Sequence, residues 1–133
     1  MTFAALGLLM ALASPLQPYV DHDRVLVVSA PSTSDAELRV QEAAIAGEMG
    51  GMGERDLVVI RVVGGEAKDD RGRSLDAAAV RHAAGLEAGR FGAALVGKDG
   101  GVKMRRHTAI PIAELFSTID AMPMRRQEMK RGG

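Results

Sequence analysis

Residues 24–30 have the sequence RVLVVSA, a nearly unbroken apolar run that is rich in β-branched side chains. The run does not alternate between apolar and polar positions, which is typical of a strand covered on both faces in an α/β sheet. Pro31 follows, and it ends the strand because it has no N–H to donate. Residues 56–63 (DLVVIRVV) predict a second buried strand. A helical segment joins the two runs, so we expect the strands to be parallel.

Polar residues outside these two runs predict the helices and loops. Ser34 and Glu37 have the capping-box spacing at the start of a helix, and we expect Gly50 to end that helix. Residues 64–73 contain three glycines and six charged side chains, which is typical of a surface loop. A second helix is expected over residues 74–84, with its first residue as the N-cap.

The remaining segments predict a hairpin and a last helix. Residues 91–97 and 102–106 are strand-like, and Asp99-Gly100 between them favours a type I′ turn. Pro111 suits the first turn of the last helix. We therefore expect an α/β domain with a four-stranded mixed sheet, in the order 2-1-3-4, and helices on both faces.

Composition limits the classes of function. A length of 133 residues with 47% hydrophobic residues suits one domain with a real core. Lys and Arg (17) balance Asp and Glu (17), so no nucleic-acid or anionic-membrane partner is expected.

The first residues differ from the rest. Residues 1–13 carry no charge, and Ala11-Leu12-Ala13 has the small-x-small form of a signal-peptidase site. The run is too short to span a membrane. It predicts a signal peptide and export to the periplasm or outside the cell, although no Lys or Arg precedes it and an ordinary amphipathic helix is the alternative. We divide the remainder into a lead-in (14–23), a domain (24–121) and a basic tail (122–133).

The order of elements over residues 24–119 resembles the thioredoxin-like superfamily. Members have a Cys-x-x-Cys after the first strand, and counting from Ala30 puts Thr33 and Ala36 at the two thiol positions. Gly92 stands where the superfamily has a cis-proline. The chain has no cysteine, so thiol–disulfide exchange is not expected.

Four segments are more narrowly similar to the family called domain of unknown function 4174. They are RVLVVSAPSTSDAELRVQ (24–41), GERDLVVIRVVGG (53–65), ALVGKDGGVKMRR (94–106) and PIAELFSTIDAMPMRRQEMKR (111–131). That family occurs in exported bacterial proteins and as a module of animal extracellular-matrix proteins. The resemblance implies a location and a fold, but no reaction.

One candidate binding site is the turn after the first strand. Ser32, Thr33 and Ser34 precede a helix, whose free N–H groups and dipole favour an anion. Arg24, or a residue of the loop Arg90–Gly92, would contribute to such a site. The alternative is plain helix capping by the serines, with their neighbours in solvent.

A second candidate surface lies in the tail, where methionines are mixed with arginines, a composition suited to protein contacts. Its residues are Met122, Met124, Arg125, Arg126 and Met129. The alternative is that these methionines only pack the last helix onto the sheet.

No catalytic residue, metal site or cofactor is predicted. His22, His82 and His107 lack the spacing of metal ligands, and we interpret them as surface residues. The leading interpretation is an exported, non-enzymatic binding module with an unidentified protein partner. The first alternative is a cysteine-independent enzyme that acts on a small anionic substrate at residues 31–35. The second is a structural domain whose tail mediates self-association into a homo-oligomer.

Overall fold

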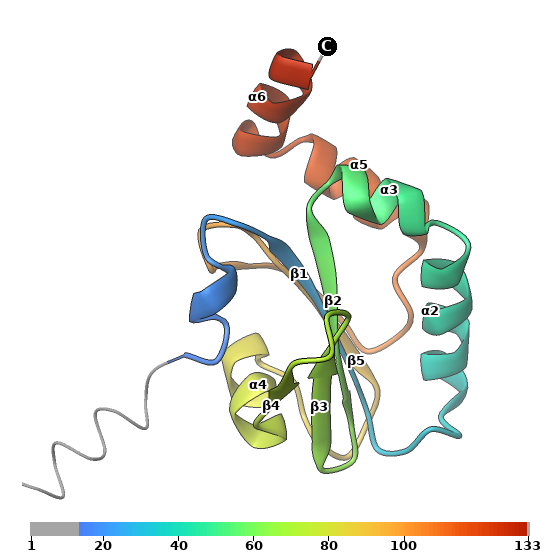
Figure 1. Cartoon of the computed structure of the whole chain (residues 1–133). Coiled ribbons are helices and arrows are strands. Elements are labelled where there is room, and N and C mark those ends of the chain that lie inside the picture. Colours follow the sequence, from blue (N-terminus) through green and yellow to red (C-terminus); the bar gives the residue numbers. More distant parts are fainter. Residues whose placement is uncertain (1–13, 133) are drawn as a thin grey trace, which may run out of the picture.

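The computed structural model describes residues 14–132 as one mixed sheet with helices packed around it (Figure 1). Across the sheet, the strand order is β4-β3-β2-β1-β5-β6. The strands are β1 (Arg24–Ala30), β2 (Leu57–Val63), β3 (Glu66–Asp69), β4 (Ser74–Leu75), β5 (Gly92–Val96) and β6 (Val102–Arg106). The helices are η1 (Gln17–Tyr19), α2 (Ala36–Ala46), α3 (Met49–Glu54), α4 (Ala77–Ala84), α5 (Ile112–Asp120) and α6 (Pro123–Gly132).

Strand β1 lies in the interior of the sheet, as its unbroken apolar run predicts. All seven of its residues are buried. It pairs in parallel with β2, from Arg24 opposite Leu57 to Ala30 opposite Val63, and antiparallel with β5. The predicted parallel pair is therefore confirmed.

Successive side chains of β1 supply two separate cores. Leu26 and Val28 point to one face, where α2, α3 and α5 cover them. Val25 and Val27 point to the other face, where α4 and η1 cover them. Because both faces carry a layer, a continuous apolar run is the sequence that this strand requires.

The expected four-stranded sheet is wrong, because the sheet has six strands. Residues 64–73, which we expected to be a surface loop, contain β3. This strand turns back on β2 and buries Ala67 and Asp69 while its other two residues are exposed. Strand β4 then pairs with β3. The charged residues suggested a loop, but an edge hairpin accommodates charges on its solvent face.

Gly50 does not end a helix. Helix α2 ends at Ala46, and both Gly50 and Gly51 lie inside the next helix, α3. A Cβ on Gly51 would lie 2.6 Å from the ring of Phe116, so the glycine permits close packing of α3 on α5. Met52 of α3 is buried in the first core, and this packing outweighs the low helix propensity of glycine.

Two helix caps lie later in the chain than predicted. The N-cap of α2 is Asp35, whose carboxylate accepts from the Leu38 N–H at 3.0 Å, while Ser34 is hydrogen-bonded to Ser32 instead. Likewise, the residue expected to cap the second helix lies in β4, and Asp76 caps α4. An aspartate carboxylate bonds N–H groups more strongly than a serine hydroxyl does.

The β5–β6 hairpin has a three-residue loop, not the expected two-residue type I′ turn. The Gly100 N–H donates to the Gly97 carbonyl at 3.0 Å, and the Gly97 N–H donates to the Gly101 carbonyl at 2.9 Å. Gly100 has a φ of 83° and Asp99 has no positive φ. A glycine in the left-handed conformation is what a loop of this length uses.

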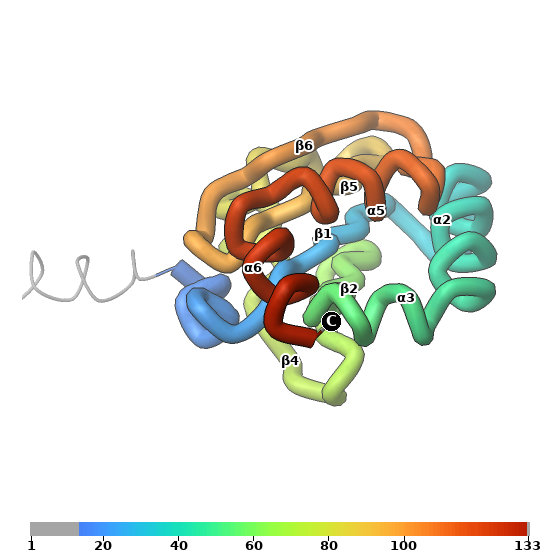
Figure 2. Tube along the Cα trace, turned by 90° about the horizontal axis from the view of Figure 1, so that it is seen from above, coloured from blue at the N-terminus to red at the C-terminus, as the bar shows by residue number. Residues whose placement is uncertain are grey.

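The C-terminal segment is helical. Pro123 begins α6, which follows α5 after a short turn and lies over the end of the sheet where β1 begins (Figures 1 and 2). None of the α6 residues described is buried. Within residues 14–132, no helix has the length and apolar character needed to cross a lipid bilayer.

Candidate functional site

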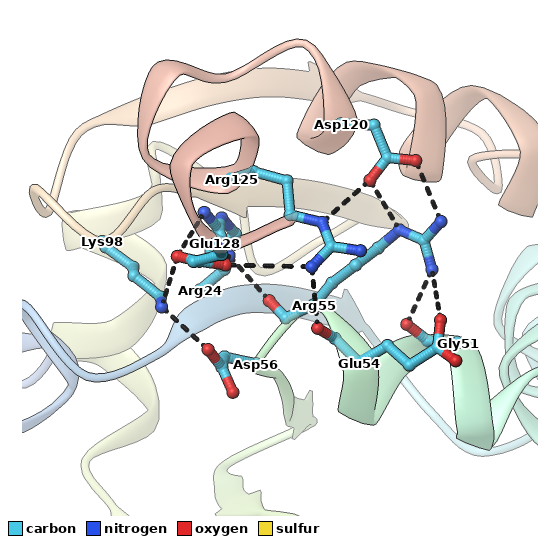
Figure 3. A network of polar contacts seen from close by, with 9 residues as sticks. All are labelled: Arg24, Gly51, Glu54, Arg55, Asp56, Lys98, Asp120, Arg125 and Glu128. Carbon is cyan, nitrogen blue, oxygen red and sulfur yellow. Dashed lines mark hydrogen bonds and ion pairs between the residues drawn. The ribbon is translucent and has the colours of Figure 1, made fainter. Parts of the chain in front are cut away.

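A network of ion pairs fastens α6 to the end of the sheet (Figure 3). The guanidinium of Arg24, the first residue of β1, donates to both carboxylate oxygens of Glu128 at 3.1 and 3.2 Å. Lys98, in the β5–β6 loop, donates to Glu128 at 2.8 Å and to Asp56 at 2.8 Å. Glu128 therefore bridges two cations that belong to different parts of the sheet.

A second branch of the network holds the start of α6. Arg55 donates to both carboxylate oxygens of Asp120 at 3.0 and 2.9 Å, and its guanidinium lies 3.9 Å from the centre of the Phe116 ring. Arg125 donates to Asp120 at 3.1 Å and to the Glu54 carbonyl at 3.0 Å. The hydrogen bond from Arg55 lowers the pKa of Asp120, burial opposes this, and Arg125 adds to the lowering.

The protonation states of the Glu128 bridge follow from its hydrogen bonds. Burial alone would raise the pKa of Glu128, but hydrogen bonds from Arg24 and Lys98 outweigh it and hold the pKa below its usual value. Burial alone would lower the pKa of Lys98, yet hydrogen bonds to Asp56 and Glu128 raise it above the usual value. Glu128 and Lys98 are therefore both ionised at neutral pH.

Arg24 is the most buried charge in the network, with 1% of its surface exposed. One of its side-chain N–H groups donates to the Arg55 carbonyl at 2.9 Å, and others donate to Glu128. Its Nε has no hydrogen-bond partner. A buried guanidinium that relies on a single carboxylate for its counter-charge depends strongly on that carboxylate.

An open pocket of about 460 Å³ lies beside the network. Its wall has an apolar side from the α5–α6 junction and a charged side from β1 and the β5–β6 hairpin. The lining residues are Arg24, Gly97, Lys98, Asp99, Lys103, Thr118, Ala121, Met122, Pro123 and Met124. This volume lies within the usual range of small-molecule sites, ~300–1,000 Å³. The arrangement suits binding of a group that is apolar at one end and anionic at the other.

The structure offers no metal-binding cluster in the part of the chain that it describes. Residues 14–132 hold no group of three or more His, Cys, Asp or Glu side chains placed around a common point. His22, His82 and His107 are all exposed, as we interpreted them from their spacing.

Apart from Arg24, the residues predicted to form an anion site after β1 take no part in the ion-pair network, and all of them except Gly92 are exposed. Ser32, Thr33 and Ser34 are exposed, and Ser32 and Ser34 bond to each other at 2.9 Å. Gly92 is buried in β5 opposite Ser29, whereas Arg90 is exposed in the preceding loop.

Arg24 cannot join that turn. It begins β1, and the turn follows the last residue of this seven-residue strand, so the two lie at opposite ends of the sheet. Of the residues predicted for the anion site, only Arg24 lines the pocket described above.

The five tail residues predicted to bind a partner divide into two groups. Met122 packs against the first core and Arg125 is fixed to Asp120, so both face the domain. Met124, Arg126 and Met129 are exposed on α6, with exposed fractions of 43% for Met124 and 39% for Met129. Met124 also lines the pocket.

Sequence reasoning missed the residues that carry the network. Arg24 drew attention only as a contributor to a different site, while Asp56, Lys98 and Glu128 were not singled out at all. One signal was available: Arg24 is a charge at the start of a fully buried strand, where an unpaired cation is costly. Nothing in the sequence indicates that its partner is residue 128, which lies 104 positions away.

Comparison with known proteins identifies a family but no activity. The model of the domain of unknown function DUF4174 matches residues 15–128. No curated protein matches the chain. The family match spans both β1 and Glu128, the two ends of the ion-pair network. The chain therefore belongs to the DUF4174 family, whose function is unknown.

Proposed function

We propose that this protein is an exported, non-enzymatic binding domain that receives a protein partner on the exposed sides of α6, where Met124 and Met129 lie. The observation that carries this proposal is the pair of methionines exposed on a helix whose orientation is fixed by ion pairs. Met124 and Met129 are two of only four large hydrophobic side chains exposed among residues 14–132. Both lie on α6, a helix of ten residues with no buried side chain among those described.

The chemistry of this face fits a protein contact. Methionine is flexible and adapts to a partner surface, and arginine is enriched where partners meet. Arg126, Lys130 and Arg131 are exposed beside the methionines. A partner with apolar pockets and an acidic rim complements that surface.

The anchors explain how a helix with no buried residue can present a defined surface. Glu128 is held by Arg24 and Lys98, and Arg125 is held by Asp120. Fixing the helix before the encounter lowers the entropic cost of binding.

Export is supported by the sequence alone. The uncharged segment 1–13 and its Ala11-Leu12-Ala13 ending have the form of a secretory signal, and this segment lies outside the described residues. Fusion of residues 1–20 to a reporter that is active only after export tests this part of the proposal.

The binding surface is tested by capture of partners from the exported fraction of the source cells. The full chain is compared with Met124→Ser/Met129→Ser, and the matched control is Val40→Ser/Met49→Ser. The control removes two exposed apolar side chains outside α6, one in α2 and one at the start of α3, the end opposite the Glu54 carbonyl that Arg125 contacts. We expect the α6 pair to lose the partner and the control pair to keep it, with both melting as the parent does. Equal capture by all three proteins, or capture by none, contradicts this proposal.

A further inference from the structure

The pocket beside α6 has two chemically different sides. Ala121, Met122, Pro123 and Met124 form an apolar wall. The other lining residues include three cations, Arg24, Lys98 and Lys103, and one carboxylate, Asp99. Lys103 is paired with Asp99 and Lys98 with Asp56 and Glu128, whereas Glu128 is the only carboxylate paired with Arg24. A ligand that matches both sides carries an apolar chain and an anionic head.

The chain already places a carboxylate on these cations. Glu128 accepts hydrogen bonds from Arg24 and from Lys98, and both of these cations line the pocket. The geometry around Glu128 therefore demonstrates that a carboxylate fits between the two side chains. Glu128 itself comes from α6, which has no buried residue among those described, so releasing its carboxylate uncovers no buried side chain of that helix.

We propose that the pocket binds a small amphipathic carboxylate, such as a medium-chain fatty acid, whose head group takes the place of Glu128 on Arg24 and Lys98. Its chain lies along Met122, Pro123 and Met124. The Arg24 Nε is buried and has no partner while Glu128 is bound, so the guanidinium keeps one unused donor. This inference goes beyond the proposed function, because it concerns a small molecule in the pocket, which shares only Met124 with the proposed protein-binding surface.

Two features favour a carboxylate with a chain over either part alone. A carboxylate without a chain would have to displace Glu128, which α6 holds at a high effective concentration, and it would gain no contact with the apolar wall in return. An uncharged chain would contact the apolar wall, but it would not replace Glu128 on Arg24 and Lys98. Only the combination gains from both sides of the pocket.

The test is a titration of the full chain with decanoate, below its micelle-forming concentration, followed by amide chemical shifts. Decanol serves as the head-group control and acetate as the chain control. We expect decanoate to bind and to shift the amides of Lys98, Met122 and Met124. Decanol and acetate are expected to bind at least about tenfold more weakly, since each lacks one set of contacts.

Three variants complete the test. Lys98→Gln is expected to weaken decanoate binding by about tenfold, because it removes a charged donor. Glu128→Gln is expected to strengthen binding, because a neutral amide competes less well for the two cations. Arg61→Gln changes a cation paired with Glu42 and Asp70 far along the sheet from α6, and is expected to leave affinity unchanged. Circular dichroism melting confirms that each variant is folded.

The outcomes separate this inference from the proposed function. No shift with decanoate, equal binding of decanol, or unchanged affinity in Lys98→Gln overturns the carboxylate site. Weaker binding by folded Glu128→Gln overturns the idea that Glu128 holds the place of the ligand head. If the parent does not bind decanoate but Met124→Ser/Met129→Ser loses the protein partner, the carboxylate site is wrong and the proposed function is supported.

Discussion

Two buried arginines are stabilised in different ways. Arg24 is neutralised by Glu128, whereas Arg81 of α4, which is 7% exposed, has no carboxylate partner in the described structure. Its guanidinium donates to the Ser29 hydroxyl at 2.8 Å and to the Gly64 carbonyl at 2.6 Å, with longer bonds to the carbonyls of Ala30 and Val62. The partial negative charges of these oxygens take the place of a counter-ion.

We expect Arg81→Met to lower the free energy of unfolding by about 2–3 kcal/mol, because it leaves buried oxygens without their donor. Arg81→Lys should recover only part of the loss, since one ammonium cannot reach the same set of acceptors. Urea unfolding measures both variants. Arg39→Met, at an exposed position of α2, is the control and should change stability by less than about 0.5 kcal/mol. An Arg81→Met variant as stable as the control would show that these bonds contribute nothing.

At the scale of elements, the ends of the helices depend on single residues. Helix α4 begins at Asp76, which accepts from the Ala79 N–H at 2.8 Å. It ends at Gly85, which has a φ of 70° and whose N–H donates to carbonyls of the last turn. Leu86 follows and is buried in the second core, so the left-handed residue directs the chain back onto the sheet.

Gly85→Ala should therefore destabilise the protein by about 1 kcal/mol, the cost of a side chain in the left-handed region. The matched control is Gly65→Ala, where φ is not positive and nothing lies within 4 Å of the added Cβ. Thermal melting followed by circular dichroism distinguishes the two. If Gly85→Ala melts together with Gly65→Ala, the left-handed cap is not a constraint on the fold.

At the scale of the whole molecule, α6 joins regions that are far apart in the chain. Glu128 contacts residues of β1 and of the β5–β6 loop, while Arg125 contacts the end of α3. The helix contributes charges and not apolar area, so its attachment depends on pH and salt in a way that the two cores do not.

The sign of the pH dependence follows from the lowered pKa of Glu128. A carboxylate whose pKa is lower in the folded protein adds stability above its unfolded pKa, and that stability is lost as the pH falls toward the folded value. We expect Glu128→Gln to cost about 2 kcal/mol at pH 7 and progressively less below about pH 4.5. Urea unfolding at several pH values measures the difference.

The matched control for this experiment is Glu114→Gln, which removes an exposed ion pair with Arg106. It should cost less than about 1 kcal/mol at pH 7. A difference between the parent and Glu128→Gln that stays constant down to pH 3 would contradict an ionised Glu128 bridge.

The centre of the sheet could be predicted from its residues alone. The runs at residues 24–30 and 56–63 are apolar without alternation, and only a strand covered on both faces needs that composition. The β5–β6 hairpin was also predictable, because its turn dipeptide and its alternation are local features. Strands β3 and β4 were not, since at the edge of a sheet a charged strand and a charged loop have the same composition.

The candidate site, in contrast, exists only in the folded chain. The sequence indicated five residues of the tail. Folding turned Met122 and Arg125 toward the domain and left Met124, Arg126 and Met129 exposed. Nothing in the sequence indicated the bridge from Arg24 and Lys98 to Glu128, because those residues are 104 and 30 positions from their partner. The pattern of apolar residues is a property of neighbouring positions in the sequence. An ion pair between distant segments forms only when folding brings those segments together.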